Sequence, residues 1–254
     1  MRPQKSNTLL KVLHKKLSID HAIEFIGVFL SIILAFALQN WSEDVKNHDK
    51  EIVYLKNLHE DLVVDYNALE RRIFEYDQKL KSTKKILQIL SSSDNSGIDS
   101  ALSIVNEELT YNSFYTPHNH TYESLKYNGD LHLITNSDFK ILLSELDISY
   151  QTTKTHGLFF LEYTNSPMWS EFLVDHLHFT GQDHLSFPQK ANEAETKKFR
   201  SHFFNRINRL HSFMENYYYS MQGTLQKIER VKTQVEKEME TQDISFKKAE
   251  ADLM

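Results

Sequence analysis

The sequence predicts an all-α protein, in which an N-terminal transmembrane helix continues into a long helical stalk and an antiparallel helical bundle carries smaller helices at its distal end. Three observations predict this fold. One stretch near the N-terminus is long and apolar, and apolar residues recur every seven positions over residues 45–90 and again over 204–239. Glycine and proline are scarce, at 6 and 4 residues. Few helix breakers and a heptad period together favour long helices over strands.

The apolar stretch is predicted to be a transmembrane helix over residues 21–41. Residues 19–41 carry few titratable side chains, and at about 1.5 Å per residue they extend about 34 Å, which is enough to cross a bilayer. Trp41 stands where an interfacial aromatic residue is expected. The sequence therefore names the lipid bilayer as a partner of this chain.

A cleaved signal peptide is the alternative interpretation of the same stretch. Ala35-Phe36-Ala37 has the small-residue spacing of a processing site. Against cleavage, the region before the apolar stretch is long, and no breaker interrupts the helical pattern at the supposed cut. We expect a retained membrane helix.

The charges on either side of this helix predict its orientation. Residues 1–20 form a short basic tail with a single acid, Asp20, whereas residues 42–57 carry more acids than lysines. Since basic flanks stay in the cytoplasm, we expect a single-pass membrane protein with a cytoplasmic N-terminus and a C-terminal domain on the other side of the membrane. The predicted domains are the cytoplasmic tail 1–20, the transmembrane helix 21–41, an extracytoplasmic helical bundle 42–245, and a polar C-terminal tail 246–254.

Two heptad runs predict the long helices of the bundle. The first run has two seams: Val45, Ile52, His59, Tyr66, Ile73, Leu80 and Leu87 on one, and His48, Leu55, Leu62, Leu69, Tyr76, Thr83 and Leu90 on the other. The second run comprises Phe204, Ile207, His211, Met214, Tyr218, Met221, Leu225, Ile228, Val235 and Met239, with Lys232 as an interruption. A loop at 91–97 ends the first helix, and the second run returns antiparallel to it.

Shorter helices are expected between the two runs, at about 100–110, 121–134, 138–163 and 167–179. Asn136, Ser137 and Ser166 are plausible N-caps, and Gly129 and Gly181 suit helix ends. No stretch alternates as a strand does.

Composition excludes some functions. The net charge of −6 and the lack of a clustered cationic surface argue against nucleic acid as a partner. The chain has no cysteine, which excludes disulfides and thiolate sites. We expect no cofactor and no catalytic residues.

Two passages resemble a family of bacterial single-pass membrane proteins that carry a domain of unknown function. The first contains the glutamate of the membrane helix, Glu24, and the exit Leu38-Gln39-Asn40-Trp41, followed by Ser42 where the family usually has Asn. The second, residues 121–134, is similar to the family's central Thr-Tyr-Glu-x-Leu-Lys-x-x-Gly segment. The resemblance implies a single-pass architecture and a bacterial envelope location, and it supplies no catalytic residues. Together with the predicted orientation it leads us to expect a protein of the cell inner membrane with a cytoplasmic N-terminus and a periplasmic C-terminal domain.

Two groups of residues are candidate interaction sites. Glu24, Gly27, Ser31 and Ala35 form one face of the membrane helix, where small residues allow close helix approach and an acid is costly enough to suggest a role. Alternatively, Glu24 lies at headgroup depth without a function. The second group is a possible binding edge made of Thr121, Tyr122, Glu123, Lys126, Asn128 and Gly129; the same segment could instead close the end of the bundle by packing.

The histidines, 13 in number, raise a metal hypothesis. His118 and His120 could converge in a loop, and Glu171, Asp175 and His178 share a helical face near His176 and His184. None of these matches a known ligand spacing. We expect a non-enzymatic, membrane-anchored interaction module that self-associates or docks another envelope protein. The alternatives are a histidine-rich hydrolase or metal-binding protein, and a sensory input domain with a separate signalling partner.

Overall fold

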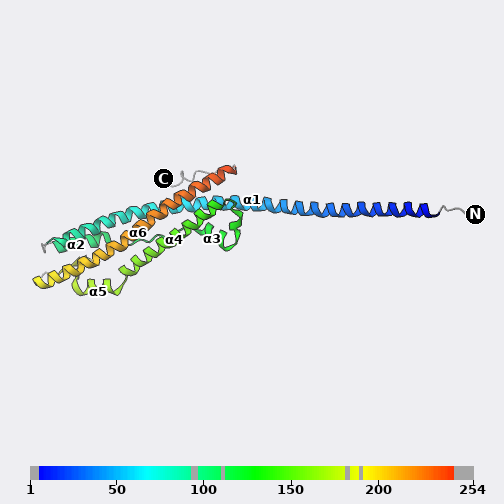
Figure 1. Cartoon of the computed structure of the whole chain (residues 1–254). Coiled ribbons are helices and arrows are strands. Elements are labelled where there is room, and N and C mark those ends of the chain that lie inside the picture. Colours follow the sequence, from blue (N-terminus) through cyan, green and yellow to red (C-terminus); the bar gives the residue numbers. More distant parts are fainter. Residues whose placement is uncertain (1–5, 93–96, 110–111, 181–183, 189–190, 243–254) are drawn as a thin grey trace, which may run out of the picture. The chain divides into compact units, whose positions relative to one another are not determined.

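The structure is a computed structural model that describes residues 6–92, 97–109, 112–180, 184–188 and 191–242, with side chains described from Ile23 onward except at 168 and 178–185. Figure 1 shows the order of the elements. They are α1 (Ser6–Ser91), α2 (Ile98–Ile104), the π-helix η2 (Val105–Leu109), α3 (His120–Tyr127), the 3₁₀-helix η3 (Asp130–Leu133), α4 (Ser137–Thr164), α5 (Pro167–His176), β1 (His178–Thr180), β2 (His184–Ser186) and α6 (Glu193–Thr241).

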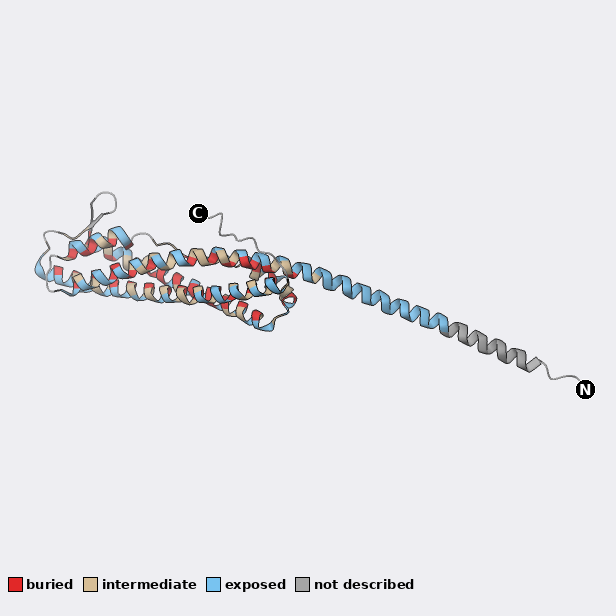
Figure 2. Cartoon of the chain, turned by 90° about the horizontal axis from the view of Figure 1, so that it is seen from above, coloured by how far each residue is buried: buried red, intermediate tan, exposed pale blue. Residues whose placement is uncertain are grey.

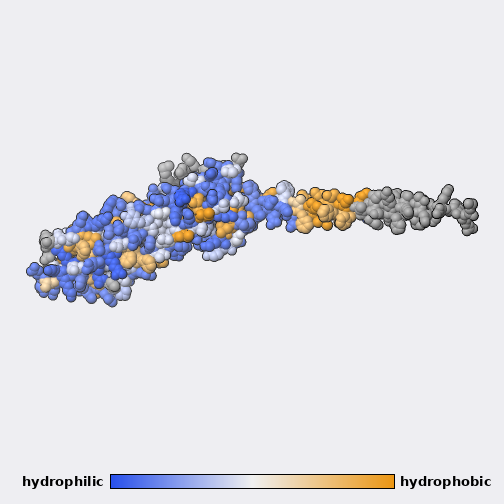
Figure 3. Space-filling view, in the orientation of Figure 1, coloured by the Kyte–Doolittle hydropathy of each residue, from blue (hydrophilic) through white to orange (hydrophobic). Residues whose placement is uncertain are grey.

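The chain divides into two compact units, Met1–Val53 and Tyr54–Met254, and α1 contributes to both. In the first unit, the large apolar side chains from Ile23 to Trp41 are all exposed. An 18-residue window here has a mean hydropathy of 1.9, and none of it is buried. Figure 3 shows it as an orange band. This helix is long and apolar enough to cross a membrane, and a signal sequence has the same properties.

The second unit is a helical bundle built on residues 54–91 of α1, on α4 and on α6, which confirms the all-α fold class. Residues further along α1 contact residues nearer the start of α6. His59 contacts Glu236, Thr83 contacts His211, and Leu90 contacts Arg200. Helix α6 therefore runs antiparallel to α1, and its contacts with α4 follow the same rule. The predicted antiparallel return of the second run is confirmed.

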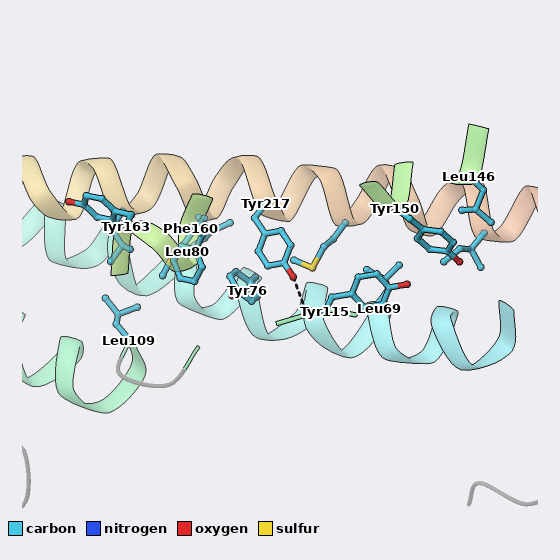
Figure 4. Packing of buried hydrophobic residues seen from close by; sticks show 14 of the residues in the cluster. Leu69, Tyr76, Leu80, Leu109, Tyr115, Leu146, Tyr150, Phe160, Tyr163 and Tyr217 are labelled. Carbon is cyan, nitrogen blue, oxygen red and sulfur yellow. Dashed lines mark hydrogen bonds between the residues drawn. The ribbon is translucent and has the colours of Figure 1, made fainter. Parts of the chain in front are cut away.

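The core lies between these three helices, and Figure 2 shows the buried residues as stripes on their facing sides. Large aromatic rings fill its centre (Figure 4): the Tyr76 ring meets Phe160 and Tyr217 edge to face, at 5.7 and 5.0 Å between centroids. Such pairs add to the burial of apolar surface. The Tyr217 hydroxyl accepts a 2.9 Å hydrogen bond from the Tyr115 amide, which attaches the segment between η2 and α3 to α6.

Helix ends follow the sequence closely. The Asn136 side chain accepts hydrogen bonds from the amides of Asp138 and Phe139, which confirms it as the N-cap of α4. Ser166 is the N-cap residue of α5 as expected, but its hydroxyl donates to Tyr163 O and forms no capping hydrogen bond with α5. Gly129 follows α3 with φ of 75°, a conformation that favours glycine.

The end of α1 is capped by another helix. The Arg200 guanidinium of α6 donates to the carbonyls of Leu90 and Ile89, at 2.9 and 3.0 Å. The last carbonyls of a helix lack amide partners in their own helix, and a cation at a helix C-terminus is favourable. The Ile89 carbonyl also accepts from the amide and the hydroxyl of Ser92, at 3.3 and 2.9 Å. The predicted end of the first long helix near Leu90 is confirmed, while Gly181 and the tail 246–254 lie outside the described residues.

One buried seam of α6 lies one residue before the predicted seam. Ile207, Met214, Met221, Ile228, Val235 and Met239 are buried as expected, but Phe204, His211, Tyr218 and Leu225 are half-buried, and their neighbours Phe203, Leu210, Tyr217 and Thr224 are buried instead. Val231, seven residues after Thr224, is buried where the prediction placed Lys232, so the seam is not interrupted there. Helix α6 packs against α1 and α4 at once, and its buried face is turned toward both.

A short hairpin was also not expected. Strands β1 and β2 pair antiparallel, with Phe179 opposite Leu185. Each has only three residues, too short for alternation to stand out in the sequence.

Candidate functional site

The predicted binding edge is held to α1 by two acids one helical turn apart. The Asp61 carboxylate accepts a 2.9 Å hydrogen bond from the Thr121 amide in the first turn of α3. The Asp65 carboxylate accepts a 2.8 Å hydrogen bond from the His118 amide just before that helix. Because the first amides of a helix lack partners in their own helix, Asp61 acts as a cap supplied by a distant part of the chain.

Asp65 is the centre of a buried polar cluster that also involves α4. The Tyr150 hydroxyl donates to Asp65 Oδ2 at 2.5 Å, and His118 Nδ1 lies 3.5 Å from Asp65 Oδ1. Burial raises the pKa of the Asp65 carboxyl above its ordinary value, although the hydrogen bonds from Tyr150 and His118 act in the opposite direction. Burial and the nearby charge of Asp65 likewise raise the pKa of Tyr150 well above its ordinary value.

Tyr115 completes this cluster without a hydrogen bond of its own side chain. Its hydroxyl is buried and finds no hydrogen-bond partner among the described residues. It lies close enough to Asp65 for burial and that charge to raise the pKa of Tyr115.

Two pockets flank this cluster and share Asn119 and Tyr150. The first has a volume of about 20 Å³, room for about one water molecule, and is lined by Leu58, Asp61, Leu62, His118, Asn119, Tyr122, Leu143, Leu146, Asp147 and Tyr150. The second has a volume of about 250 Å³ and opens between the segment before α3 and α4, beside Phe114, Pro117, Glu123 and Lys154. Small-molecule sites usually measure roughly 300–1,000 Å³, so the wider pocket is smaller than a usual small-molecule site.

The structure divides the predicted edge residues between the core and the surface. Thr121 is buried, and Tyr122 is half-buried beside Ser144 of α4. On the outside, Lys126 pairs with Asp147 of α4 at 3.2 Å, while Asn128 and Gly129 are exposed. Glu123 is half-buried and accepts a hydrogen bond from Asn119 at 3.3 Å. Part of the edge therefore packs, and a binding role for its outer residues stays a prediction.

Sequence reasoning missed Asp65 and its partner Tyr150. A signal was present: Leu58, Leu62 and Leu69 mark one apolar face of α1, and Asp65 falls on that face. A lone acid on an apolar face must be paired or protonated when buried. The partners could not be predicted, because Tyr150 is far away in sequence and resembles any other core tyrosine.

The predicted face of the membrane helix is exposed throughout. Glu24, Gly27, Ser31 and Ala35 are all exposed, and Ser31 Oγ donates to Gly27 O at 2.8 Å. A Cβ atom at Gly27 would meet nothing within 4 Å. Packing inside the described chain therefore does not require a glycine there, and an association role for this face stays a prediction.

The histidine candidates do not converge on a metal site where the structure describes them. The rings of His118 and His120 lie 6.3 Å apart, edge to face. No group of three or more His, Asp or Glu side chains within the described residues is placed to hold a metal ion. The side chains of His178 and His184 lie outside the described residues.

Fold and sequence together define an all-helical protein that combines an exposed apolar N-terminal segment with a three-helix core. The family model described as "Family of unknown function (DUF6090)" matches residues 24–157, more than half of the chain, and the protein belongs to that family. The match includes the apolar segment, Asp65, α3 and most of α4. Comparison with curated proteins and with solved structures finds no match.

Proposed function

We propose that this protein is a membrane-anchored helical interaction module of a bacterial envelope, and that its role is to bring proteins together rather than to catalyse a reaction. The observation that carries the proposal is the apolar window of α1, which has a mean hydropathy of 1.9 and is entirely exposed. Apolar side chains gathered without cover mark a surface that another medium or molecule covers.

A bilayer is the cover that fits this window best. Its apolar residues point in all directions around the helix, whereas a protein partner would require only one apolar side. Each strongly apolar residue favours insertion by about 0.3–0.6 kcal/mol at a helix centre, and the acid Glu24 is near the start, where a charge costs less. The basic tail 1–20 supports a cytoplasmic N-terminus, which puts the bundle in the periplasm.

An interaction role fits the outer surface of the bundle. Tyr127 of α3 and Ile141 and Ile148 of α4 are large, apolar and exposed. Figure 3 shows apolar patches over α3 and α4 on an otherwise mostly hydrophilic surface. Exposed apolar groups on rigid helices are typical of docking surfaces.

Extraction of cell membranes at alkaline pH tests the anchor. We expect the full chain to remain with the membranes, and intact mass measurement to show that residues 1–37 are retained. Release into the soluble fraction, or a chain that begins after Ala37, would contradict the anchor and support a signal sequence.

Labelling with a membrane-impermeant maleimide tests orientation, because the chain has no cysteine of its own. We expect Ser124→Cys, on the exposed side of α3, to react in spheroplasts, and Ser6→Cys to react only after lysis. The reverse pattern would contradict the proposed orientation.

A further inference from the structure

The outward face of α4 carries an exposed stripe without formal charge. The core side of this helix presents Phe139, Leu143, Leu146, Tyr150, Thr153 and Phe160. On the opposite side lie the residues of what we name the α4 stripe: Ile141, Ser144, Ile148, Thr152, Thr155 and Phe159, all exposed. At about 100° per residue they occupy about 80° of the circumference of the helix. The stripe follows the helix over most of its length.

The polar groups of the stripe are already satisfied by their own chain. Thr152 Oγ1 donates to Ile148 O, and Thr155 Oγ1 donates to Gln151 O, both at 2.8 Å. Ser144 lies within hydrogen-bonding reach of Tyr122. The threonines therefore present their methyl groups, and covering them with another surface leaves no hydroxyl without a partner. Burial of a polar group is costly only when its hydrogen bonds are lost.

The stripe has the register of a two-stranded parallel coiled coil. Ile141, Ile148 and Thr155 are seven residues apart and take the a position, where β-branched residues favour two strands. Lys140 then takes position g and Glu145 takes position e of the same helix. In a parallel, in-register pair, g of one helix meets e of the following heptad in the other, so Lys140 would face Glu145 twice.

These two side chains are suited to such a pairing. Lys140 and Glu145 are half-buried, and no ion pair of either side chain is found within the described residues. Lys227 of α6 donates to the backbone carbonyl of Glu145 at 3.3 Å and not to its carboxylate. Because a two-fold interface requires a surface complementary to itself, a stripe with a neutral centre and with opposite charges at facing positions suits a second copy of the same chain.

We propose that two copies of this protein associate through the α4 stripe in a parallel, in-register pair. The pairing rests on the proposed membrane anchor, because Ser144 and Gln151 at the d positions make a weak seam. Confinement in one membrane raises the effective concentration of the two stripes and allows a weak seam to be occupied.

Disulfide trapping in cell membranes tests this pairing directly, since the natural chain has no cysteine. Ile148→Cys and Ile141→Cys should each form a disulfide-linked dimer on mild oxidation, because facing a positions approach within the Cα separation of about 4.4–6.8 Å that a disulfide needs. Tyr219→Cys on α6 is the matched control, with 59% of Tyr219 exposed against 62% of Ile148. We expect dimer yields severalfold above this control.

The outcomes separate failure of the pairing from failure of the anchor. If the variants are in the membrane fraction and Ile148→Cys dimerises no more than Tyr219→Cys, the pairing is wrong although the anchor holds. Loss of the chain from the membrane fraction contradicts the anchor itself. Linkage of Ile148→Cys to a different protein overturns the pairing of two copies. Preferential linkage of Ile148→Cys to Thr152→Cys in a second copy indicates an antiparallel arrangement and overturns the parallel pair.

Charge reversal provides a readout that a merely structural role would not change. In the Ile148→Cys background, Lys140→Glu places an acid at position 140 opposite Glu145 of the other copy, so each facing pair becomes two acids. The dimer yield should fall severalfold. Adding Glu145→Lys should restore it. If the doubly reversed chain dimerises no better than Lys140→Glu alone, the proposed register is wrong.

Discussion

Helix α1 contains two apolar stretches whose surroundings differ completely. From Ile23 to Trp41 every large apolar side chain is exposed, whereas Leu55, Leu62 and Leu69 are buried in the bundle. The difference follows from how the apolar residues are distributed around the helix. In the first stretch they occupy all sides. In the second most of them keep to one face, and the other face is mainly charged or polar, with Val64 and Phe74 as exposed apolar exceptions. A one-sided pattern indicates a protein core, and an all-round pattern indicates a medium that surrounds the helix.

The largest expected effect compares a leucine from each stretch. Leu69→Ala should lower the free energy of unfolding of the bundle by about 2–5 kcal/mol, because Leu69 is 0% exposed and its removal leaves a cavity. Leu34→Ala, at a residue 62% exposed, should leave it unchanged. Thermal unfolding of the full chain in mild detergent, followed by the near-UV signal of the aromatic core, measures both. Equal destabilisation by the two variants would contradict the division of α1.

An acid stands in each stretch, and the second effect compares them. Asp65→Asn should destabilise the bundle by about 1–3 kcal/mol, because Tyr150 and the His118 amide donate to different carboxylate oxygens and an asparagine side chain has only one accepting oxygen. Glu24→Gln should leave the stability of the bundle unchanged, and serves as the control in the same unfolding measurement. An Asp65→Asn chain as stable as the natural one would show that the cluster contributes nothing to attaching the segment before α3.

A glycine in each region gives the third comparison. A Cβ at Gly157 of α4 would lie 2.3 Å from the Phe114 ring and 3.0 Å from the Tyr217 ring, so Gly157→Ala should cost about 1–3 kcal/mol through overpacking. A Cβ at Gly27 meets nothing within 4 Å, and Gly27→Ala should not destabilise the bundle. Denaturant titration of the two variants measures the difference. A neutral Gly157→Ala would mean that Phe114 moves aside freely.

The smallest expected effect is a pH dependence of the stability of the bundle, at a contact between α6 and α1. His211 of α6 lies 2.7 Å from Thr83, and burial lowers the pKa of His211 from its ordinary value of 6.5. The unfolded chain therefore binds the proton more tightly, so this contribution to stability is complete above pH 6.5 and is lost as the pH falls through the lower, folded value. In a plot of the free energy of unfolding against pH, His211→Gln should remove the part of the decrease below pH 6.5 that His211 causes.

Thr83→Val is the control for that measurement, since it removes the hydrogen bond and keeps the titrating ring. Thr83→Val should lower the free energy of unfolding slightly at every pH and keep the decrease below pH 6.5. If the profile of His211→Gln matches that of the natural chain below pH 6.5, another group is responsible for the slope.

Local patterns in the sequence predicted the helices, and long-range packing decided what they did not predict. The heptad seam from Leu55 to Leu90 and the helix ends at Asn136 and Gly129 are local signals, and the structure places them as expected. The other predicted seam of α1 is only partly buried, since Tyr66, Ile73 and Leu87 are half-buried. The second seam of α6 could not be derived from its own sequence, because Phe203 and Phe204 are equally apolar. Phe203 is the buried one, and it packs against Phe172 of α5, a contact that no local spacing reports. Similarly, the Asp65 cluster joins α1, α4 and the segment before α3, and no local spacing reports that meeting.

A cysteine scan along α1 tests the difference between its two stretches most directly. Single cysteines are placed at each position from 23 to 62 and labelled in intact membranes with a water-soluble maleimide. We expect uniform protection from about residue 25 to residue 38 on all sides of the helix. From residue 54 onward labelling should instead follow the helix period, with Leu55, Leu58 and Leu62 protected and Lys56, Asn57 and Glu60 labelled. Periodic or complete labelling of residues 25–38 would contradict membrane insertion of the first stretch.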